Sequence, residues 1–188
     1  MPLPSAKRIW RTTLRALFNP NWKQQALRSR ELRQAVTQFQ HRAIYHDITP
    51  DILRNIRDND LIQAIYDCVE ARLPREHVGI VPPALGLPRA CTSIYYYRMM
   101  DYDVGNGGFD QFLNGSGAEV AVQTVESLRF LGLPQIADVV AEALERFAAG
   151  KSTSDCDTSY AKLHPAAEPH LIGFIRAHPD EFTTTQAA

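Results

Sequence analysis

The side chains most suited to binding or catalysis lie in one short run, Asp103 to Gly117. Asn106, Gln111 and Asn114 carry amides there, and a side-chain amide both donates and accepts hydrogen bonds. Such groups can bind a ligand, or they can satisfy the backbone groups that a tight turn leaves open. The second role is favoured, because Gly107 and Gly108 follow Asn106 and Gly115 follows Asn114, as expected of turns.

A phosphate site is the first alternative for this run. The turn Gly105-Asn106-Gly107-Gly108 can reach positive φ at little cost, and a glycine-rich loop before a helix can cradle phosphate with its free N–H groups. The run has neither GxGxxG nor a P-loop Lys-Ser or Lys-Thr, and Asp101, Asp103 and Asp110 give it negative charge. The sequence therefore argues against phosphate.

Catalytic and metal-binding patterns are missing from the sequence. No histidine lies in HExxH or in a Cys/His cluster with zinc spacing, and Ser116 between two glycines fits a helix cap better than a nucleophile turn. Cys68, Cys91 and Cys156 lie far apart and are expected to be free thiols in a reducing compartment. We expect no metal and no cofactor, and we keep an enzyme centred on residues 106–114 as an alternative.

Charge divides the chain into a basic arm and an acidic body. Residues 1–42 carry nine Lys or Arg and one acid, a net charge of +8, and residues 43–188 carry −9. The total of −1 conceals this asymmetry. We therefore predict a basic helical extension over 1–42 and one all-helical domain over 43–188.

The arm begins with a basic amphipathic helix. Lys7, Arg8, Arg11 and Arg15 surround an apolar face that includes Trp10. Such a helix can bind nucleic acid, lie on an anionic membrane, target an organelle, fold back on the acidic body or pack in a dimer. A second basic helix is predicted for residues 22–42.

Two acidic stripes are predicted on helices of the body. Glu119 and Glu126 are spaced i, i+7, and Asp138, Glu142 and Glu145 are spaced i, i+4, i+7. They form a candidate acidic binding surface, although a solvated outer face would explain the same residues.

The remaining pattern predicts an all-α fold of about six to eight helices, without strands. Thr49, Pro50 and Asp51 mark a helix start, and that helix should reach about Leu73 with an interruption at residues 58–60. Residues 74–88 hold too many breakers for a regular element, and a helix is predicted for 88–104.

Further helices follow the glycine run. Gly105 to Gly108 should form a turn, residues 109–114 a short helix with Phe109 and Phe112 in the core, and Ser116 with Glu119 a capping box. Helices at 116–132 and 134–149 should be antiparallel neighbours. Residues 150–165 are predicted to be partly loop, before a last helix at 168–177.

The run from Asp103 to Gly117 resembles the signature of the DNA mimic protein family, an all-helical bacterial group otherwise described as a domain of unknown function. The motif residues that match are Asn106, Gly107, Gly108, Phe109, Gln111, Phe112 and Asn114. Gly105 and Leu113 depart from the family pattern, and the resemblance spans about residues 50–182. Neither departure threatens the fold.

The resemblance implies a dimeric acidic protein whose carboxylates stand in for phosphates on a transcription factor. We therefore predict a non-enzymatic, cytoplasmic, protein-binding domain. Its partner is expected to be a DNA-binding protein, with a homodimer as a further expectation. The alternative is nucleic-acid or membrane binding through the arm. No apolar run is long enough to span a membrane.

Overall fold

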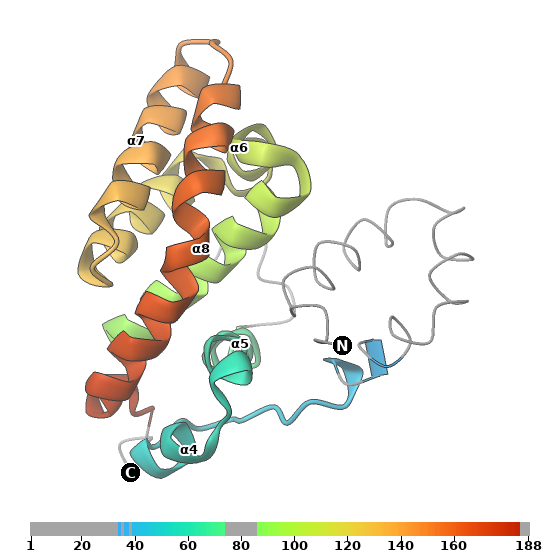
Figure 1. Ribbon diagram of the computed structural model, residues 1–188, viewed down its shortest axis with the longest axis vertical. Coiled ribbons are helices and arrows are strands. Elements are labelled where there is room, and N and C mark those ends of the chain that lie inside the picture. The colour runs from blue at the N-terminus through green and yellow to red at the C-terminus, as the bar shows by residue number, and fades with distance from the viewer. Residues whose placement is uncertain (1–33, 35, 38, 74–85, 185–188) are drawn as a thin grey trace. The chain divides into compact units, whose positions relative to one another are not determined.

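The computed structural model describes residues 34, 36, 37, 39–73 and 86–184 (Figure 1). The chain divides between Ala43 and Ile44, and the fold below is that of the second unit. Of the helix predicted for 22–42, the described residues are helical up to Gln40. The rest of that helix, including Leu32 and Ala35, and the whole first helix of the arm lie outside the described residues.

The second unit is all-helical where it is described, as predicted. Its elements are α4 (Pro50–Asn55), α5 (Asp58–Glu70), α6 (Arg89–Phe130), α7 (Pro134–Ala148), α8 (Ser154–Ala177) and the 3₁₀ turn η2 (Pro179–Phe182). The five α-helices among the described residues of this unit do not confirm the predicted six to eight. α6 packs against α5, α7 and α8, and Figure 1 shows α7 and α8 side by side.

The first helix starts as predicted but is interrupted elsewhere. The Thr49 hydroxyl accepts the Ile52 N–H at 3.2 Å, and Pro50 is the first helical residue. The break falls at Ile56 and Arg57, so the interruption predicted at 58–60 is wrong. Asp58 and Asp60 instead form the first turn of α5, where carboxylates complement the helix dipole.

α6 is one long element divided by glycines. Gly107, Gly108 and Gly117 have non-helical backbone angles, which separate three segments at 89–106, 109–116 and 118–130. The turn predicted at residues 105–108 is therefore limited to Gly107 and Gly108, and the short helix predicted for residues 109–114 continues up to the break at Gly117. The Ser116 hydroxyl donates to Asp103 at 3.4 Å, and no hydrogen bond joins Ser116 to Glu119, so the predicted capping box is not formed.

The corner between α6 and α7 agrees with the prediction. Gly132 has a φ of 76°, and the Leu133 N–H bonds the Leu128 carbonyl at 2.8 Å, which closes α6. Pro134 then opens α7, and Gly150 ends it with a φ of 66°. A connection this short makes the last segment of α6 and α7 antiparallel neighbours.

α8 corrects the prediction for the C-terminal region. It is one helix of 24 residues, although residues 150–165 were predicted to be partly loop. Pro165 and Pro169 lie inside it, where each removes one helical hydrogen bond. A continuous buried stripe outweighs that loss, since packing, more than propensity, decides helix stability. The stripe consists of Cys156, Tyr160, Ala167, Leu171 and Ile175.

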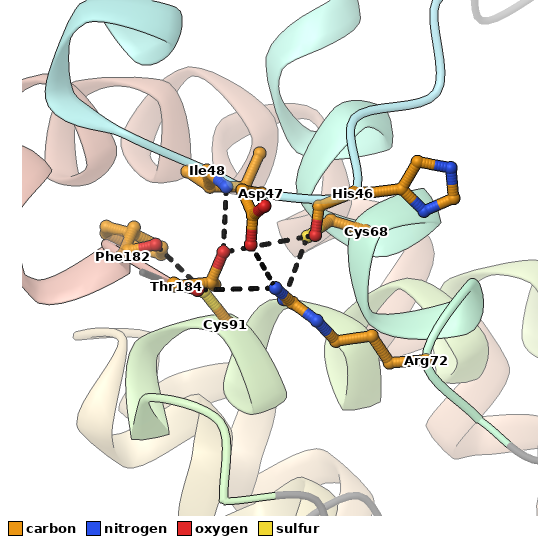
Figure 2. Close-up of polar contacts among 8 residues, drawn as sticks. All are labelled: His46, Asp47, Ile48, Cys68, Arg72, Cys91, Phe182 and Thr184. Carbon is orange, nitrogen blue, oxygen red and sulfur yellow. Dashed lines mark hydrogen bonds and ion pairs between the residues drawn. The ribbon is translucent and has the colours of Figure 1, made fainter. Parts of the chain in front are cut away.

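Both ends of the described unit meet in a cluster that we call the terminal latch, shown in Figure 2. Its members are His46, Asp47, Ile48, Cys68, Arg72, Cys91, Phe182 and Thr184. Ile48 donates its N–H to the Thr184 hydroxyl at 2.7 Å, and the Thr184 N–H returns to the Ile48 carbonyl at 2.9 Å. Arg72 bonds the Asp47 carboxylate at 2.6 Å and the Thr184 carbonyl at 3.2 Å.

Two buried thiols complete the latch. Cys68 donates to the His46 carbonyl at 3.4 Å, and Cys91 donates to the Phe182 carbonyl at 3.3 Å (Figure 2). Burial raises the pKa of Cys68 and raises that of Cys91 to about 12, so both stay protonated donors at neutral pH. Cys156 is buried as well, and none of the three forms a disulfide.

Thr184→Val tests the latch. Valine keeps the shape but leaves the buried Ile48 N–H without its acceptor, so the free energy of unfolding should fall by about 1 to 3 kcal/mol. Thr158→Val is the matched control, because Thr158 is exposed on α8 and its hydroxyl bonds only its own helix. Urea denaturation of both variants measures the difference, and equal effects would mean that the latch bond contributes nothing.

Candidate functional site

The glycine junction of α6 is shaped by its contact with α8. Gly108 has φ 76° and ψ −174°, a region that essentially only glycine occupies. A Cβ at Gly108 would lie 2.6 and 2.8 Å from the carboxylate oxygens of Asp157. Both the backbone angles and the close approach therefore require glycine here.

Two hydrogen bonds join the starts of two helical segments at this junction. The Phe109 N–H, the first of the second α6 segment, donates to Asp157 Oδ1 at 2.8 Å. In return the Thr153 hydroxyl, at the start of α8, donates to Asp110 Oδ1 at 2.8 Å. Each carboxylate lies in the first turn of a helix, where the helix dipole favours negative charge. The pair of bonds fixes α8 against α6.

The aromatic motif residues lie in the core, as their spacing predicts. Phe109 and Phe112 are both fully buried, and Leu113 is buried beside them. The Phe109 ring and the Tyr160 ring of α8 form a T-shaped pair, with centroids 5.9 Å apart. These side chains position the junction rather than face a ligand.

The motif amides bond within the junction. Gln111 Nε2 donates to Asp103 at 3.3 Å, and Asn114 Nδ2 donates to the Asp110 carbonyl at 2.7 Å. Asn114 thus satisfies a backbone carbonyl, as expected, whereas Gln111 bonds a carboxylate instead. Asn106, the third motif amide, is half-buried. Burial raises the pKa of Asp103, although the bonds from Gln111 and Ser116 oppose the shift. The Asp157 carboxylate already accepts the Phe109 N–H at this helix start. A phosphate bound there would therefore be repelled by the negative charge of Asp157.

A second group of polar side chains, which we call the polar network, includes Asp101 of α6, about two helical turns before Gly108. Asp101 Oδ1 lies 2.7 Å from His164 Nε2 and accepts the Tyr160 hydroxyl at 2.7 Å, and Arg98 bonds Oδ2 at 3.0 Å. Arg98 also reaches Gln63 of α5 at 3.3 Å. The network therefore ties α5, α6 and α8 together.

The charge on Asp101 is stabilised in spite of its burial. Burial alone disfavours the charged form, but the hydrogen bond and charge of His164, the charge of Arg98 and the hydrogen bond from Tyr160 outweigh it. The pKa of Asp101 is consequently lowered below its ordinary value of 3.8.

Sequence reasoning missed the α8 partners of this region. Thr153, Asp157, Tyr160 and His164 lie in the segment predicted to be partly loop. A usable signal was present, because a threonine followed by acids in the next turn is typical of a helix start, and Tyr160 and His164 have i, i+4 spacing. The prolines in α8 obscured it.

The candidate acidic surface is exposed on the last segment of α6 and on α7. We call Glu119, Glu126, Asp138, Glu142 and Glu145 the acidic face, and all five are exposed. Arg129 of α6 lies 3.5 Å from Asp138 of α7, which joins the two stripes beside the Gly132 corner. Arg146 bonds Glu142 at 2.8 Å and Asp155 at 3.3 Å.

The candidate basic residues Lys7, Arg8, Arg11 and Arg15 lie outside the described residues. Within the described ranges, no helix is long and apolar enough to cross a membrane. In the same ranges, no three His, Cys, Asp or Glu side chains gather as metal ligands would.

The fold and the junction together define an all-helical domain built on a glycine-broken helix, with an exposed acidic face. Residues 86–178 match the model of the family described as DMP19-like protein. The resemblance to the DNA mimic protein family is confirmed for this segment, which is shorter than the expected 50–182. Comparison with curated proteins finds no match, and comparison with solved structures finds none either.

Gly108→Ala tests the junction. The methyl group would force an unfavourable φ and collide with Asp157, so the free energy of unfolding should fall by about 2 kcal/mol or more. Gly105→Ala is the control, since an added Cβ meets nothing within 4 Å there and alanine favours a helix by up to about 1 kcal/mol. Thermal unfolding distinguishes the two; a Gly108→Ala protein as stable as wild type would contradict this account.

Asp101→Asn tests the polar network through pH. A carboxylate with a lowered folded pKa contributes stability that is fully present above its unfolded pKa and lost as pH falls through the folded pKa. The variant should lose about 2 to 4 kcal/mol at pH 7, and its deficit should shrink below about pH 4. Exposed Glu181→Gln serves as control in urea titrations at each pH. A deficit independent of pH would indicate that the charge is unimportant.

Proposed function

We propose that this chain is a non-enzymatic DNA mimic whose acidic face occupies the DNA-binding surface of a partner protein. The match of residues 86–178 to the DMP19-like family carries the proposal. The acidic face supports it from the chemistry of the chain itself, since exposed carboxylates attract the lysines and arginines that bind phosphates.

The spacing of the carboxylates suits this role. Asp138, Glu142 and Glu145 rise by about 6 and 4.5 Å along α7. Duplex phosphates recur about every 3.4 Å per strand along the axis, so these steps correspond to roughly one or two phosphates. Glu119 and Glu126 add a second row on the neighbouring helix, at an interaxial distance of about 8 to 10 Å.

The arginines beside the face do not prevent binding. Five carboxylates with Arg129 and Arg146 leave a net charge of −3 on this surface. The Arg129 and Asp138 side chains are 59% and 72% exposed, and such exposed pairs contribute little free energy. A partner cation can therefore replace Arg129 at a small cost.

An enzyme centred on residues 106–114 is the weaker hypothesis. Gln111, Asn114 and Asp110 bond neighbours in the junction, and Phe109 and Phe112 are in the core. Groups held in this way position a helix, and none is a nucleophile beside a base.

The basic arm is the second candidate. Its charge of +8 in residues 1–42 favours binding to nucleic acid or to an anionic membrane. A homodimer is a third hypothesis for the partner. If the arm binds DNA or anionic vesicles, this binding should weaken as salt is added. Replacing Lys7, Arg8, Arg11 and Arg15 by Gln in the full chain should then abolish it. Binding that is unchanged in this variant would rule out the arm as the binding site.

The face can be tested with the full chain as bait. The wild type should capture DNA-binding protein from lysate, and added duplex DNA should release it, because mimic and DNA compete for one surface. A variant with Asp138→Asn, Glu142→Gln and Glu145→Gln should lose most of this capture.

A matched triple variant keeps the same net charge as that bait. It carries Asp60→Asn, Asp180→Asn and Glu181→Gln, all at exposed acids outside the face, and should capture as wild type does. Capture that duplex DNA cannot release, or equal loss in both triple variants, would refute the DNA mimic.

A further inference from the structure

Arg146 is held at the edge of the acidic face by three hydrogen bonds. Its Nε donates to Glu142 Oε1 at 2.8 Å, and its Nη1 donates to the Ser152 carbonyl and to Asp155 Oδ2, each at 3.3 Å. The three acceptors belong to α7, to the loop that follows it and to the first turn of α8. Arg146 therefore has a fixed position where these two helices meet.

The second arginine of the face is held more loosely. Among the described residues the Arg129 side chain bonds only Asp138, at 3.5 Å, and it is 59% exposed. Arg146 is 32% exposed, and it would leave three acceptors without their donor if a partner cation displaced it. A partner surface made only of lysines and arginines would therefore be repelled by the positive charge that remains at Arg146. The partner needs a different side chain at this point.

Arg146 and Glu142 still have a donor and an acceptor to offer. The bonds of Arg146 use Nε and Nη1, so its Nη2 makes no hydrogen bond with any residue that the structure describes. The Glu142 side chain is 54% exposed, and its bond to Arg146 uses Oε1 and leaves Oε2 without a partner in the described part of the chain. The ion pair thus presents N–H donors beside a carboxylate oxygen, with no net charge of its own.

The major-groove edge of adenine offers the same combination. Adenine presents its N6 donor beside its N7 acceptor, and proteins read this pair with the amide of Asn or Gln, which bonds both atoms. A neutral amide suits Arg146 and Glu142 better than a charged side chain does. A lysine would be repelled by Arg146, and a carboxylate would be repelled by Glu142 and Asp155, which already lie within 3.3 Å of Arg146.

We propose that the Arg146 and Glu142 pair imitates the major-groove edge of an adenine and binds an amide side chain on the base-reading surface of the partner. This inference rests on the proposed function. Arg146 Nη2 donates to the oxygen of the amide, and the amide N–H donates to Glu142 Oε2. The carboxylates of Asp138 and Glu145 on the same helix stand in for phosphates. The partner is therefore a DNA-binding protein that reads an adenine with Asn or Gln.

Two lysine-rich peptides of equal length and charge test the pair, with asparagine at the central position of one and leucine in the other. Fluorescence anisotropy at low salt measures their affinity for the full chain. The wild type should bind the asparagine peptide about fivefold to tenfold more tightly, because its amide bonds two charged groups. Arg146→Lys should remove this preference, since an ammonium is a point charge that lacks the planar fork of donors. Arg129→Lys, the same change at the loosely held arginine, is the matched control and should keep the preference.

The outcomes separate the two proposals. If the variant with Asp138→Asn, Glu142→Gln and Glu145→Gln binds both peptides as the wild type does, the acidic face itself is refuted. If that variant loses both peptides but the wild type binds the two equally, only the adenine mimic is refuted. Thermal unfolding of Arg146→Lys gives a further check: a lower melting temperature with an unchanged preference for the asparagine peptide would mean that Arg146 only stabilises the fold, and would also refute the mimic.

Discussion

The carboxylate of Asp157 against the bare backbone of Gly108 is the contact on which the domain depends. It ends one helical segment, starts the next by accepting the Phe109 N–H, and fixes the first turn of α8 in the same place. A side chain at position 108 would separate the two helices. The Phe109 and Tyr160 rings could then no longer meet, and the polar network around Asp101 would lose its α8 half.

α8 connects this junction with the opposite end of the domain. At its far end, Arg176 donates to the carbonyls of Leu53 and Ile56, where α4 ends, and to Asp58 at the start of α5. α8 therefore forms hydrogen bonds at the end of α4, at the start of α5 and at the start of the second segment of α6. That arrangement explains how two internal prolines are tolerated, because the helix is held along its length by bonds to its neighbours.

Local signals in the sequence predicted what is local in the structure. The Thr49 cap, the Gly132 and Pro134 corner and the burial of Phe109 and Phe112 follow from caps, breakers and spacing. The extent of α8 could not be predicted this way, since prolines argue for a loop and only tertiary packing overrides them. Asp157 as the partner of Gly108 was equally out of reach, because the two are 49 positions apart. For the acidic face, spacing predicted the stripes, but the Arg129 to Asp138 contact that joins them depends on the fold.

The terminal latch also determines how the domain responds to pulling. Ile48 and Thr184 are paired by two short hydrogen bonds, so the chain enters and leaves the described unit at the same corner. A load applied through the two ends would strain these few bonds one after another, before any helix interface carried force. The same proximity makes the corner suitable for circular permutation of residues 44–184, in which a short linker joins Thr184 to Ile44 and new ends open at a surface turn such as Gly150.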